Sequence, residues 1–274
     1  MSEFIKKLST RALASERYKE ATNELFRSYI YKMIGMEAEI NREHVKQLIT
    51  IAQYFYKVND SKFRKEGAAL LSMLLDVCGN SYPEIIAIAN RVFSSSGDFP
   101  NIKLIEKNYP DLSFKYSFYS EAEMDFRQEL NTVDELSFPL TDFQRTLWES
   151  LILDEDVITV APTSAGKTHI ILSYLIRRMI DSDGAFAAII VPTRALISEV
   201  ANKLYEIAKE QNYEKEIEIC TVPQDDGYAD KTFFVMTQER LLEALQAGDL
   251  SFNYLFIDEA HNISDESRGV LLHL

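Results

Sequence analysis

The chain is poor in cysteine, glycine and proline. Its 274 residues include two cysteines, nine glycines and seven prolines. Two cysteines are too few for a disulfide framework or a cysteine-based metal cluster, so we expect free thiols at Cys78 and Cys220 and a reduced, cytoplasmic setting. Because glycine and proline concentrate in turns, their scarcity favours a helix-rich protein and disfavours a many-turned β-sandwich.

Long apolar runs and an excess of basic charge are also missing. No run approaches the 18 or so apolar residues of a membrane span, so we expect no membrane partner. Lys and Arg number 29 against 43 Asp and Glu, a net charge of −14. Residues 138–274 hold most of this excess, with 11 basic and 23 acidic residues. The balance disfavours a protein that simply coats nucleic acid, but it leaves room for a local nucleic-acid site.

Residues 1–137 predict an all-α domain. Apolar residues at helical spacing predict helices at 3–34, 42–58, 61–78, 82–94 and 119–131. A serine-rich stretch and two prolines predict a loop between about 94 and 119. The apolar stripes of these helices are typical of an ordinary helical core, and the alternative interpretation is a module that docks a partner protein.

Residues 138–274 have a different pattern, in which short apolar runs rich in β-branched residues alternate with helical stretches. Strands are predicted at 157–161, 186–192, 216–222, 232–237 and 254–258, and helices at 167–180, 195–210 and 238–246. This alternation predicts an α/β fold with a parallel sheet covered on both faces. The chain is therefore expected to have two domains, 1–137 and 138–274.

A phosphate-binding loop is predicted between the first of these strands and its helix. The loop comprises Ala161, Pro162, Thr163, Ser164, Ala165, Gly166, Lys167 and Thr168, with alanine where the usual first glycine stands. Backbone N–H groups at the start of the helix attract phosphate oxygens, and Gly166 allows close approach. Lys167 would supply a cation and Thr168 an oxygen ligand for Mg²⁺. The alternative is a simple glycine-ended turn before an amphipathic helix.

Two adjacent acids, Asp258 and Glu259, end the last predicted strand, 91 residues after Lys167. This separation leaves room for several βα units, so the strand can present its carboxyl end to the same nucleotide. Asp258 would then hold Mg²⁺, and Glu259 would activate the attacking water. The alternative is that both acids cap the next helix. His261 would couple the nucleotide site to another domain or satisfy a structural hydrogen bond.

Taken together, these motifs resemble the DExH branch of superfamily-two helicases. Ala161–Thr168 is similar to their motif I, and Asp258–His261 spells their motif II. Asp142-Phe143-Gln144 precedes Lys167 as their adenine-reading glutamine does, while 191–196 is similar to motif Ia and 236–241 to motif Ib. The sequences of motif I and of the stretch from Asp258 to Gly269 most resemble those of the Ski-like subgroup. Helices preceding such a motor resemble the helicase subunit of Hachiman-type bacterial anti-phage systems.

The resemblance implies a RecA-like lobe at 138–274 that binds ATP with Mg²⁺ and a nucleic-acid strand. Gln144 would read adenine, and Phe143 would pack beside the base or in the core. The residues implied to contact a single-stranded or partly duplex nucleic acid are Pro192, Thr193, Arg194 and Thr237. For Arg194, the alternative is a solvated residue at the start of a helix.

The family motor also needs a second RecA-like lobe with an arginine finger, and its motifs do not occur in these 274 residues. We therefore expect that lobe as a partner, on further sequence or on a separate chain. An arginine finger is worth orders of magnitude in rate, so the 274 residues alone are expected to bind ATP weakly and hydrolyse it poorly. The alternative to an ATP-dependent helicase is an ATP-responsive docking or scaffold module, with a nuclease or other effector bound to residues 1–137.

Overall fold

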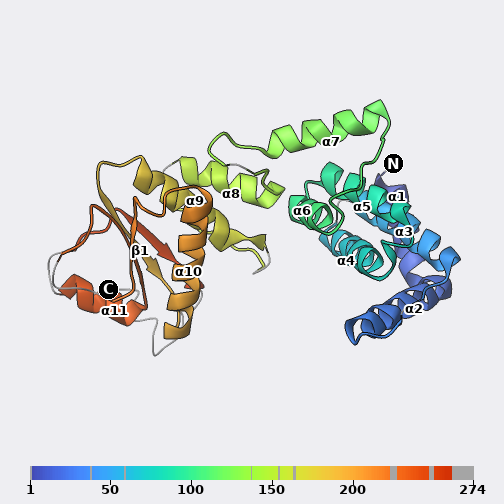
Figure 1. The fold of residues 1–274 in the computed structure, drawn as a ribbon, viewed down its shortest axis with the longest axis horizontal. Helices are drawn as coiled ribbons and strands as arrows, with labels where there is room; N and C mark the ends of the chain where they lie inside the picture. Colours follow the sequence, from blue (N-terminus) through green and yellow to red (C-terminus); the bar gives the residue numbers. More distant parts are fainter. Residues whose placement is uncertain are drawn as a thin grey trace. The chain divides into compact units, whose positions relative to one another are not determined.

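In the computed structural model the chain forms two compact units, Met1–Thr141 and Asp142–Leu274 (Figure 1). The structure describes residues 2–260 apart from 38, 59, 137, 154, 163, 164, 223–226 and 247–249. Among these residues no helix is long and apolar enough to cross a membrane.

Seven helices make up the described part of the first unit, as expected for an all-α region. They are α1 (Ser2–Ala14), α2 (Glu16–Met33), α3 (Arg42–Tyr56), α4 (Ser61–Cys78), α5 (Pro83–Ser96), α6 (Phe99–Asn108) and α7 (Phe118–Asn131). Their core is apolar and includes the fully buried side chains of Leu48, Phe55, Leu71, Ile85 and Phe93. Burial of such side chains, each stabilising by about 1.5–3 kcal/mol, holds the short helices together.

Capping residues set several helix boundaries in this unit and correct two of the predictions. The single helix predicted at 3–34 is wrong, because Ser15 interrupts it and accepts a hydrogen bond from the Tyr18 N–H at 3.2 Å, which caps α2. The loop predicted between 94 and 119 contains α6. Pro100 lies in the first turn of α6, where its missing N–H costs no hydrogen bond, so this proline helps to begin a helix.

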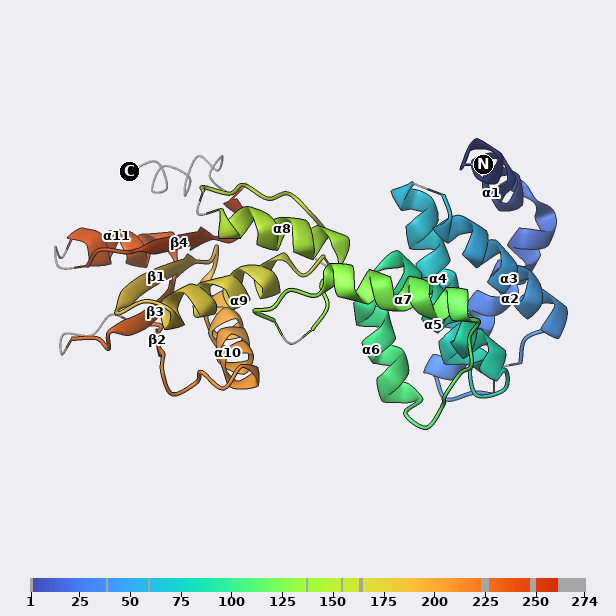
Figure 2. The same ribbon diagram turned by 90° about the horizontal axis from the view of Figure 1, so that it is seen from above.

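The second unit is an α/β lobe. Its described elements are α8 (Asp142–Ile152), α9 (Lys167–Ile180), β1 (Ala185–Ile190), α10 (Arg194–Glu210), β2 (Glu218–Cys220), β3 (Lys231–Met236), α11 (Gln238–Gln246) and β4 (Tyr254–Ile257). The strands are all parallel, in the order β2-β3-β1-β4. Helices α9 and α10 cover one face of the sheet and α11 covers the other (Figures 1 and 2).

Burial accounts for the position of each strand in this sheet. β1 is paired on both sides and its residues are almost entirely buried, as are those of β3. Ala188, Ile190, Phe234 and Met236 pack with Leu241 of α11 on one face. Strands buried on both faces read as continuous apolar runs, which is why the sequence predicts them well.

The strand predicted at 157–161 is wrong. These residues are extended but pair with none of the described strands, and every second side chain among them is exposed. Their β-branched side chains favour extended backbone, but a strand also needs a neighbour that offers hydrogen bonds. The strand predicted at 216–222 shortens to β2 for the same reason, since β3 pairs with three of its residues.

Candidate functional site

The turn that precedes α9 is built around Gly166. This glycine caps α9 with φ 75° and ψ 22°, a left-handed conformation that other residues rarely adopt. A Cβ atom at this position would lie 2.5 Å from Nε2 of Gln144. The backbone angle therefore favours glycine, whereas the Gln144 amide, at the end of a flexible side chain, could shift to admit a Cβ atom. The close approach brings Gln144 of α8 to the beginning of α9.

Hydrogen bonds fold the described part of the phosphate loop into a compact turn. Nε2 of Gln144 donates to the Ala165 carbonyl at 3.4 Å, and the Ala165 N–H donates to the Pro162 carbonyl at 3.0 Å. Nζ of Lys167 donates to the Ala161 carbonyl at 2.7 Å. The first backbone N–H groups of α9 have no helical partner, and the helix dipole gives them a partial positive charge. The turn thus brings together backbone N–H groups and the Lys167 ammonium, which attract an anion.

Asp258 and Glu259 lie directly after β4. The Asp258 N–H donates to the carbonyl of Ile190 at 2.9 Å, which extends the pairing of β4 with β1 to this residue. Glu259 has φ 53°, a left-handed conformation that is uncommon outside glycine, and its N–H donates to Oδ1 of Asp258 at 3.1 Å. A sharp turn therefore separates the two carboxylates, and strained backbone of this kind clusters at functional sites.

Electrostatics connect the loop to this acidic turn. Burial raises the pKa of Asp258, and the negative charge of Glu259 raises it further. The ammonium groups of Lys167 and Lys203 act on the same pKa in the opposite direction. Since charges act over short distances in a protein, Lys167 and Asp258, the central residues of the two predicted motifs, lie within electrostatic range of each other.

The donor set fits Mg²⁺ bound together with a nucleotide. Among the described residues, no group of three or more His, Cys, Asp or Glu is placed to hold a metal ion by itself. Mg²⁺ usually takes one or two protein oxygens and completes its shell with water and substrate phosphates. The Asp258 carboxylate and the Thr168 hydroxyl, in the first turn of α9, are oxygen donors of this kind.

The residues predicted to contact nucleic acid follow the carboxyl ends of the neighbouring strands. Thr193 and Arg194 come after β1 and are exposed at the start of α10, while Pro192 is half-buried. Thr237 follows β3, but its side chain is only 4% exposed. β1 lies next to β4 in the sheet, and β3 lies on the far side of β1. Along this edge of the sheet, Thr193 and Arg194 are therefore nearer to the acidic turn than Thr237 is.

Of the remaining predicted site residues, one lies on α8 and three lie outside the described part of the chain. Phe143 is half-buried on α8, beside Gln144 in the sequence. Thr163, Ser164 and His261 lie outside the described residues. The sequence prediction missed Lys203, an exposed residue of α10 whose charge acts on Asp258. No motif marks Lys203, because its proximity to Asp258 arises only when α10 packs on the sheet.

A glycine-ended loop before a helix, joined to two acids after a parallel strand, defines the class of the second unit: an α/β RecA-like lobe with a phosphate loop. Comparison with known families agrees. Residues 141–274 match the family described as DEAD/DEAH box helicase.

Two curated proteins illustrate the relationship. The chain is 30% identical over 136 residues to the ATP-dependent RNA helicase DBP3 of Candida glabrata, a match that covers 46% of this chain and 25% of the relative. It is 30% identical over 135 residues to the ATP-dependent RNA helicase DBP3 of Saccharomyces cerevisiae, covering 46% and 26%. The chain thus matches about a quarter of the length of these relatives. No solved structure gave a significant match.

Proposed function

We propose that the chain is the ATP-binding part of an ATP-dependent nucleic-acid helicase or translocase. The observation that carries the proposal is that Asp258 ends β4, which pairs with β1, while Lys167 begins α9, which packs against β1. The Lys167 ammonium also acts to lower the pKa of Asp258, although 91 residues separate the two in the sequence. A cation from a phosphate loop and a carboxylate after a parallel strand are what ATP–Mg²⁺ requires. The helicase family of residues 141–274 supports the same reading.

Each residue then has a chemical role. The loop from Ala161 to Thr168 binds the phosphates through backbone N–H groups and the Lys167 ammonium. Gln144 reads the adenine edge, and Phe143 packs beside the base. Asp258 and Thr168 hold Mg²⁺, which neutralises phosphate charge when bound. Glu259 orients and deprotonates the attacking water, and His261 couples the site to another domain.

The nucleic-acid strand is assigned to the other strand ends. Thr193 and Arg194 contact its phosphates, assisted by Pro192 and the turn at Thr237. A few backbone contacts and one arginine suffice, so the acidic charge of residues 138–274 is no obstacle. The strand is single-stranded or partly duplex. Both relatives are named RNA helicases, which makes RNA the first strand to test.

The residues of the motifs also suggest a helicase subgroup and a biological role. The phosphate loop and the stretch from Asp258 to Gly269 favour the Ski-like subgroup, and the helical region before the lobe favours the helicase subunit of a Hachiman-type antiviral defence system. We assign a second RecA-like lobe as the partner that completes the ATP site. Residues 1–137 form the domain that docks a nuclease or other effector, and the protein works in the cytoplasm.

A docking module without turnover is the second candidate. The first unit favours it, because several large apolar side chains near the end of α2 are exposed: Phe26, Ile30, Met33 and Ile34. Exposed apolar clusters on a helix commonly mark interaction surfaces. In this reading ATP binding would control what the first unit binds.

The ATPase rate with and without single-stranded RNA or DNA tests the proposal. The expected result is poor turnover by residues 1–274 alone and strand-stimulated turnover when a second RecA-like lobe is present, on a separate chain or in the product of any longer reading frame. Glu259→Gln should retain ATP and abolish turnover, because it removes the base but not the phosphate contacts. ATP binding without turnover under every condition would favour the docking module.

A further inference from the structure

Helix α7 turns its most apolar side away from the rest of the first unit. The helix lies at the surface of this unit beside α5 (Figures 1 and 2). Its side chains Phe118, Tyr119 and Phe126 are 87%, 78% and 63% exposed. The residues of α7 that are half-buried or buried are mostly polar: Ser120, Met124, Arg127 and Asn131. Because a helix ordinarily buries its apolar side, α7 has the opposite orientation to a helix that packs only within its own unit.

Polar contacts at both ends of α7 fix this orientation. Before the helix, the Tyr116 hydroxyl donates to the Ala87 carbonyl of α5 at 3.1 Å and accepts a hydrogen bond from Nδ2 of Asn90 at 3.1 Å. At the last residue of the helix, Nδ2 of Asn131 donates to the Leu140 carbonyl at 2.7 Å. Since hydrogen bonds are directional, α7 cannot roll to bury its aromatic side without breaking these contacts.

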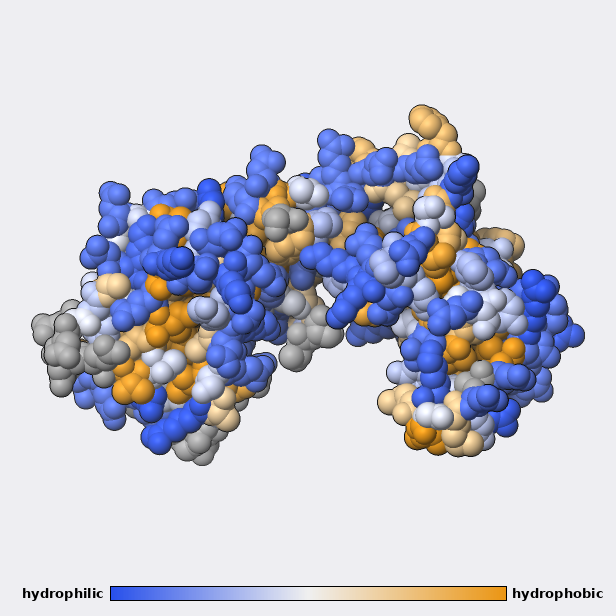
Figure 3. All heavy atoms as spheres, viewed as in Figure 1, coloured by the Kyte–Doolittle hydropathy of each residue, from blue (hydrophilic) through white to orange (hydrophobic). Residues whose placement is uncertain are grey.

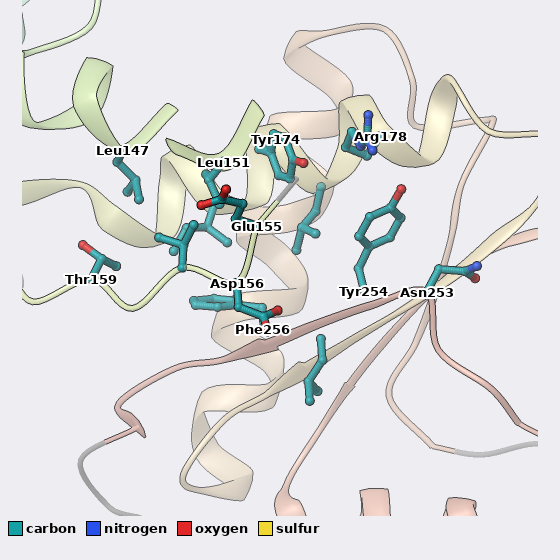
Figure 4. Close-up of a pocket in the computed structure, with 14 residues that line it drawn as sticks. Leu147, Leu151, Glu155, Asp156, Thr159, Tyr174, Arg178, Asn253, Tyr254 and Phe256 are labelled. Carbon is teal, nitrogen blue, oxygen red and sulfur yellow. The ribbon is translucent and has the colours of Figure 1, made fainter. Parts of the chain in front are cut away.

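The exposed side chains of α7 form one aromatic stripe, which comprises Phe118, Tyr119, Ala122 and Phe126. Residues four apart are neighbours on a helix, so Phe118, Ala122 and Phe126 follow one another along one side. Apolar side chains from α8, α9 and β4 of the second unit differ, because they line a cavity of about 500 Å³ (Figure 4). The aromatic stripe projects into solvent instead, and exposed apolar clusters of this kind mark interaction surfaces.

Acidic side chains border the aromatic stripe. Glu121, Glu123 and Glu129 are all exposed, and each stands three residues from Phe118 or Phe126. This spacing makes them neighbours of the aromatic rings on the helix surface. In sequence α7 contains four acidic residues and one basic residue. The aromatic stripe therefore has a negatively charged border.

This border decides which kind of occupant fits the aromatic stripe. The phosphates of a nucleic acid and the headgroups of an anionic membrane would be repelled by the carboxylates. A second copy of the chain would bring its own acidic border against this one, which is also unfavourable. A cationic partner is attracted by the same groups. The occupant should therefore be apolar along one side and basic at its margins.

From these observations we infer that the aromatic stripe binds a basic amphipathic helix of a partner protein. The apolar side of that helix covers Phe118, Tyr119 and Phe126, and its lysines or arginines lie beside the acidic border. Helices pack side by side along such stripes, and the eight residues from Phe118 to Phe126 span about 12 Å, so two to three turns of the partner suffice. The inference rests on the docking role proposed for residues 1–137, to which it gives a surface, and not on the ATP site.

A labelled helical peptide tests the aromatic stripe. The probe is a ~18-residue peptide of leucine and lysine with leucines at the spacing of one helix side, and fluorescence anisotropy measures its affinity for the 274-residue chain. Phe126→Ser should weaken binding at least ~10-fold, because aromatic anchors carry most of the energy of such interfaces. Phe26→Ser removes a phenylalanine of α2 with similar exposure, 57%, and should change the affinity less than ~2-fold.

The outcomes of this pair separate the surface from the docking role. Unchanged affinity in Phe126→Ser, or an equal loss in both variants, would overturn the assignment to α7. A loss in Phe26→Ser alone would also overturn it, but would leave the docking role of residues 1–137 standing on α2.

A charge-matched pair of double variants tests the acidic border. Glu121→Lys with Glu129→Lys should weaken peptide binding at least ~10-fold. Glu206→Lys with Glu210→Lys changes two exposed acids of α10 and the net charge by the same amount, and should weaken binding less than ~3-fold. Equal losses would show general attraction to an acidic chain and would overturn the inference. ATP affinity, measured in the same samples, should stay unchanged in both, which separates this result from the ATP proposal.

Sedimentation velocity tests a second copy of the chain as the occupant. The inference predicts that the 274-residue chain is not held together through the aromatic stripe, so Phe126→Ser should leave its sedimentation coefficient unchanged. A dimer that Phe126→Ser dissociates would assign the stripe to a second copy and overturn the inference.

Discussion

Lys167 is the residue on which the candidate site depends most. Its ammonium donates to the carbonyl of Ala161 and also acts on Asp258 across the site. The lysine therefore lies between the loop that would bind phosphate and the acid that would hold Mg²⁺. A neutral side chain at this position removes the positive charge that acts on both the phosphate loop and Asp258.

Lys167→Ala is expected to abolish ATP binding. Charge-assisted hydrogen bonds contribute about 1.5–3 kcal/mol each, so loss of those to the phosphates should weaken binding at least ~100-fold. Calorimetric titration with ATP and Mg²⁺ measures the change. Lys209→Ala removes an exposed lysine in the last turn of α10 and serves as the control, with a much smaller loss expected. Unchanged affinity in Lys167→Ala would contradict the phosphate-loop assignment.

Asp258→Asn should stabilise the nucleotide-free protein at neutral pH. The pKa of Asp258 is raised in the folded state by burial and by Glu259, so its charged form costs stability above that pKa. As pH falls through the folded pKa and then the ordinary aspartate range, the native side chain takes up a proton and the cost disappears. Because Asp258 is partly exposed, the rise in Tm should stay below about 4 °C.

Thermal unfolding of Asp258→Asn and the unaltered protein at pH 7 and at pH 3 measures this difference. The two Tm values should converge at the lower pH. With ATP and Mg²⁺ present the order should reverse, because the variant loses an oxygen ligand that carries charge. A variant less stable at pH 7 without nucleotide would show that Asp258 makes favourable contacts that outweigh its burial.

At the scale of elements, the order of the strands separates the two proposed binding sites. β4 ends at the acidic turn, β1 ends at Thr193 and Arg194, and β3 ends at Thr237, in that order along one edge. Ligands of open parallel sheets bind at the carboxyl ends of the strands. Neighbouring strand ends can therefore hold ATP and a nucleic-acid strand side by side.

Thr193→Ala with Arg194→Ala should weaken strand binding about 10-fold or more without changing ATP affinity in the absence of nucleic acid. Loss of an arginine–phosphate contact should also reduce the salt dependence of binding by about one unit of slope. Fluorescence anisotropy with labelled single-stranded RNA at several salt concentrations gives both quantities. Lys209→Ala, at the other end of α10, is the matched control. A fall in ATP affinity would move these residues into the nucleotide site.

At the scale of the whole molecule, the chain consists of two units with separate cores. The helices of the first unit enclose one apolar cluster, while the second unit builds its own around the sheet. Figure 3 shows a mostly hydrophilic surface with apolar patches on the face that it presents of each unit. Most of the acidic excess belongs to residues 138–274. The two units therefore differ in charge as well as in architecture.

Residues 1–141 should fold without the second unit, because their apolar cluster is complete within them. A chain of these residues is expected to show helical circular dichroism and one cooperative thermal transition. Leu74→Ala, which truncates a fully buried side chain of α4, should destabilise it by about 2–5 kcal/mol. Leu104→Ala truncates an exposed leucine of α6 and should change stability little. A non-cooperative transition would mean that the second unit is needed for this core.

Much of the molecule follows from local sequence. The helix α9, the strands β1, β3 and β4, and the all-α first unit were predictable, because apolar periodicity and capping residues act over a few neighbours. The phosphate loop and the pair Asp258–Glu259 were equally visible as motifs. Their residue types are fixed by chemistry, since phosphate needs a cation and close backbone, and Mg²⁺ needs oxygen.

Only the tertiary structure decided how these pieces meet. Strand pairing depends on partners far along the chain, so the sequence could not reveal that, among the described strands, 157–161 pairs with none and β4 pairs with β1 alone. The burial of Thr237 and the charge of Lys203 near Asp258 likewise arise when α10 and α11 pack on the sheet. The sequence alone determined which groups could bind ATP, whereas packing decided which of them share a site, because burial and electrostatic interaction depend on distance in space.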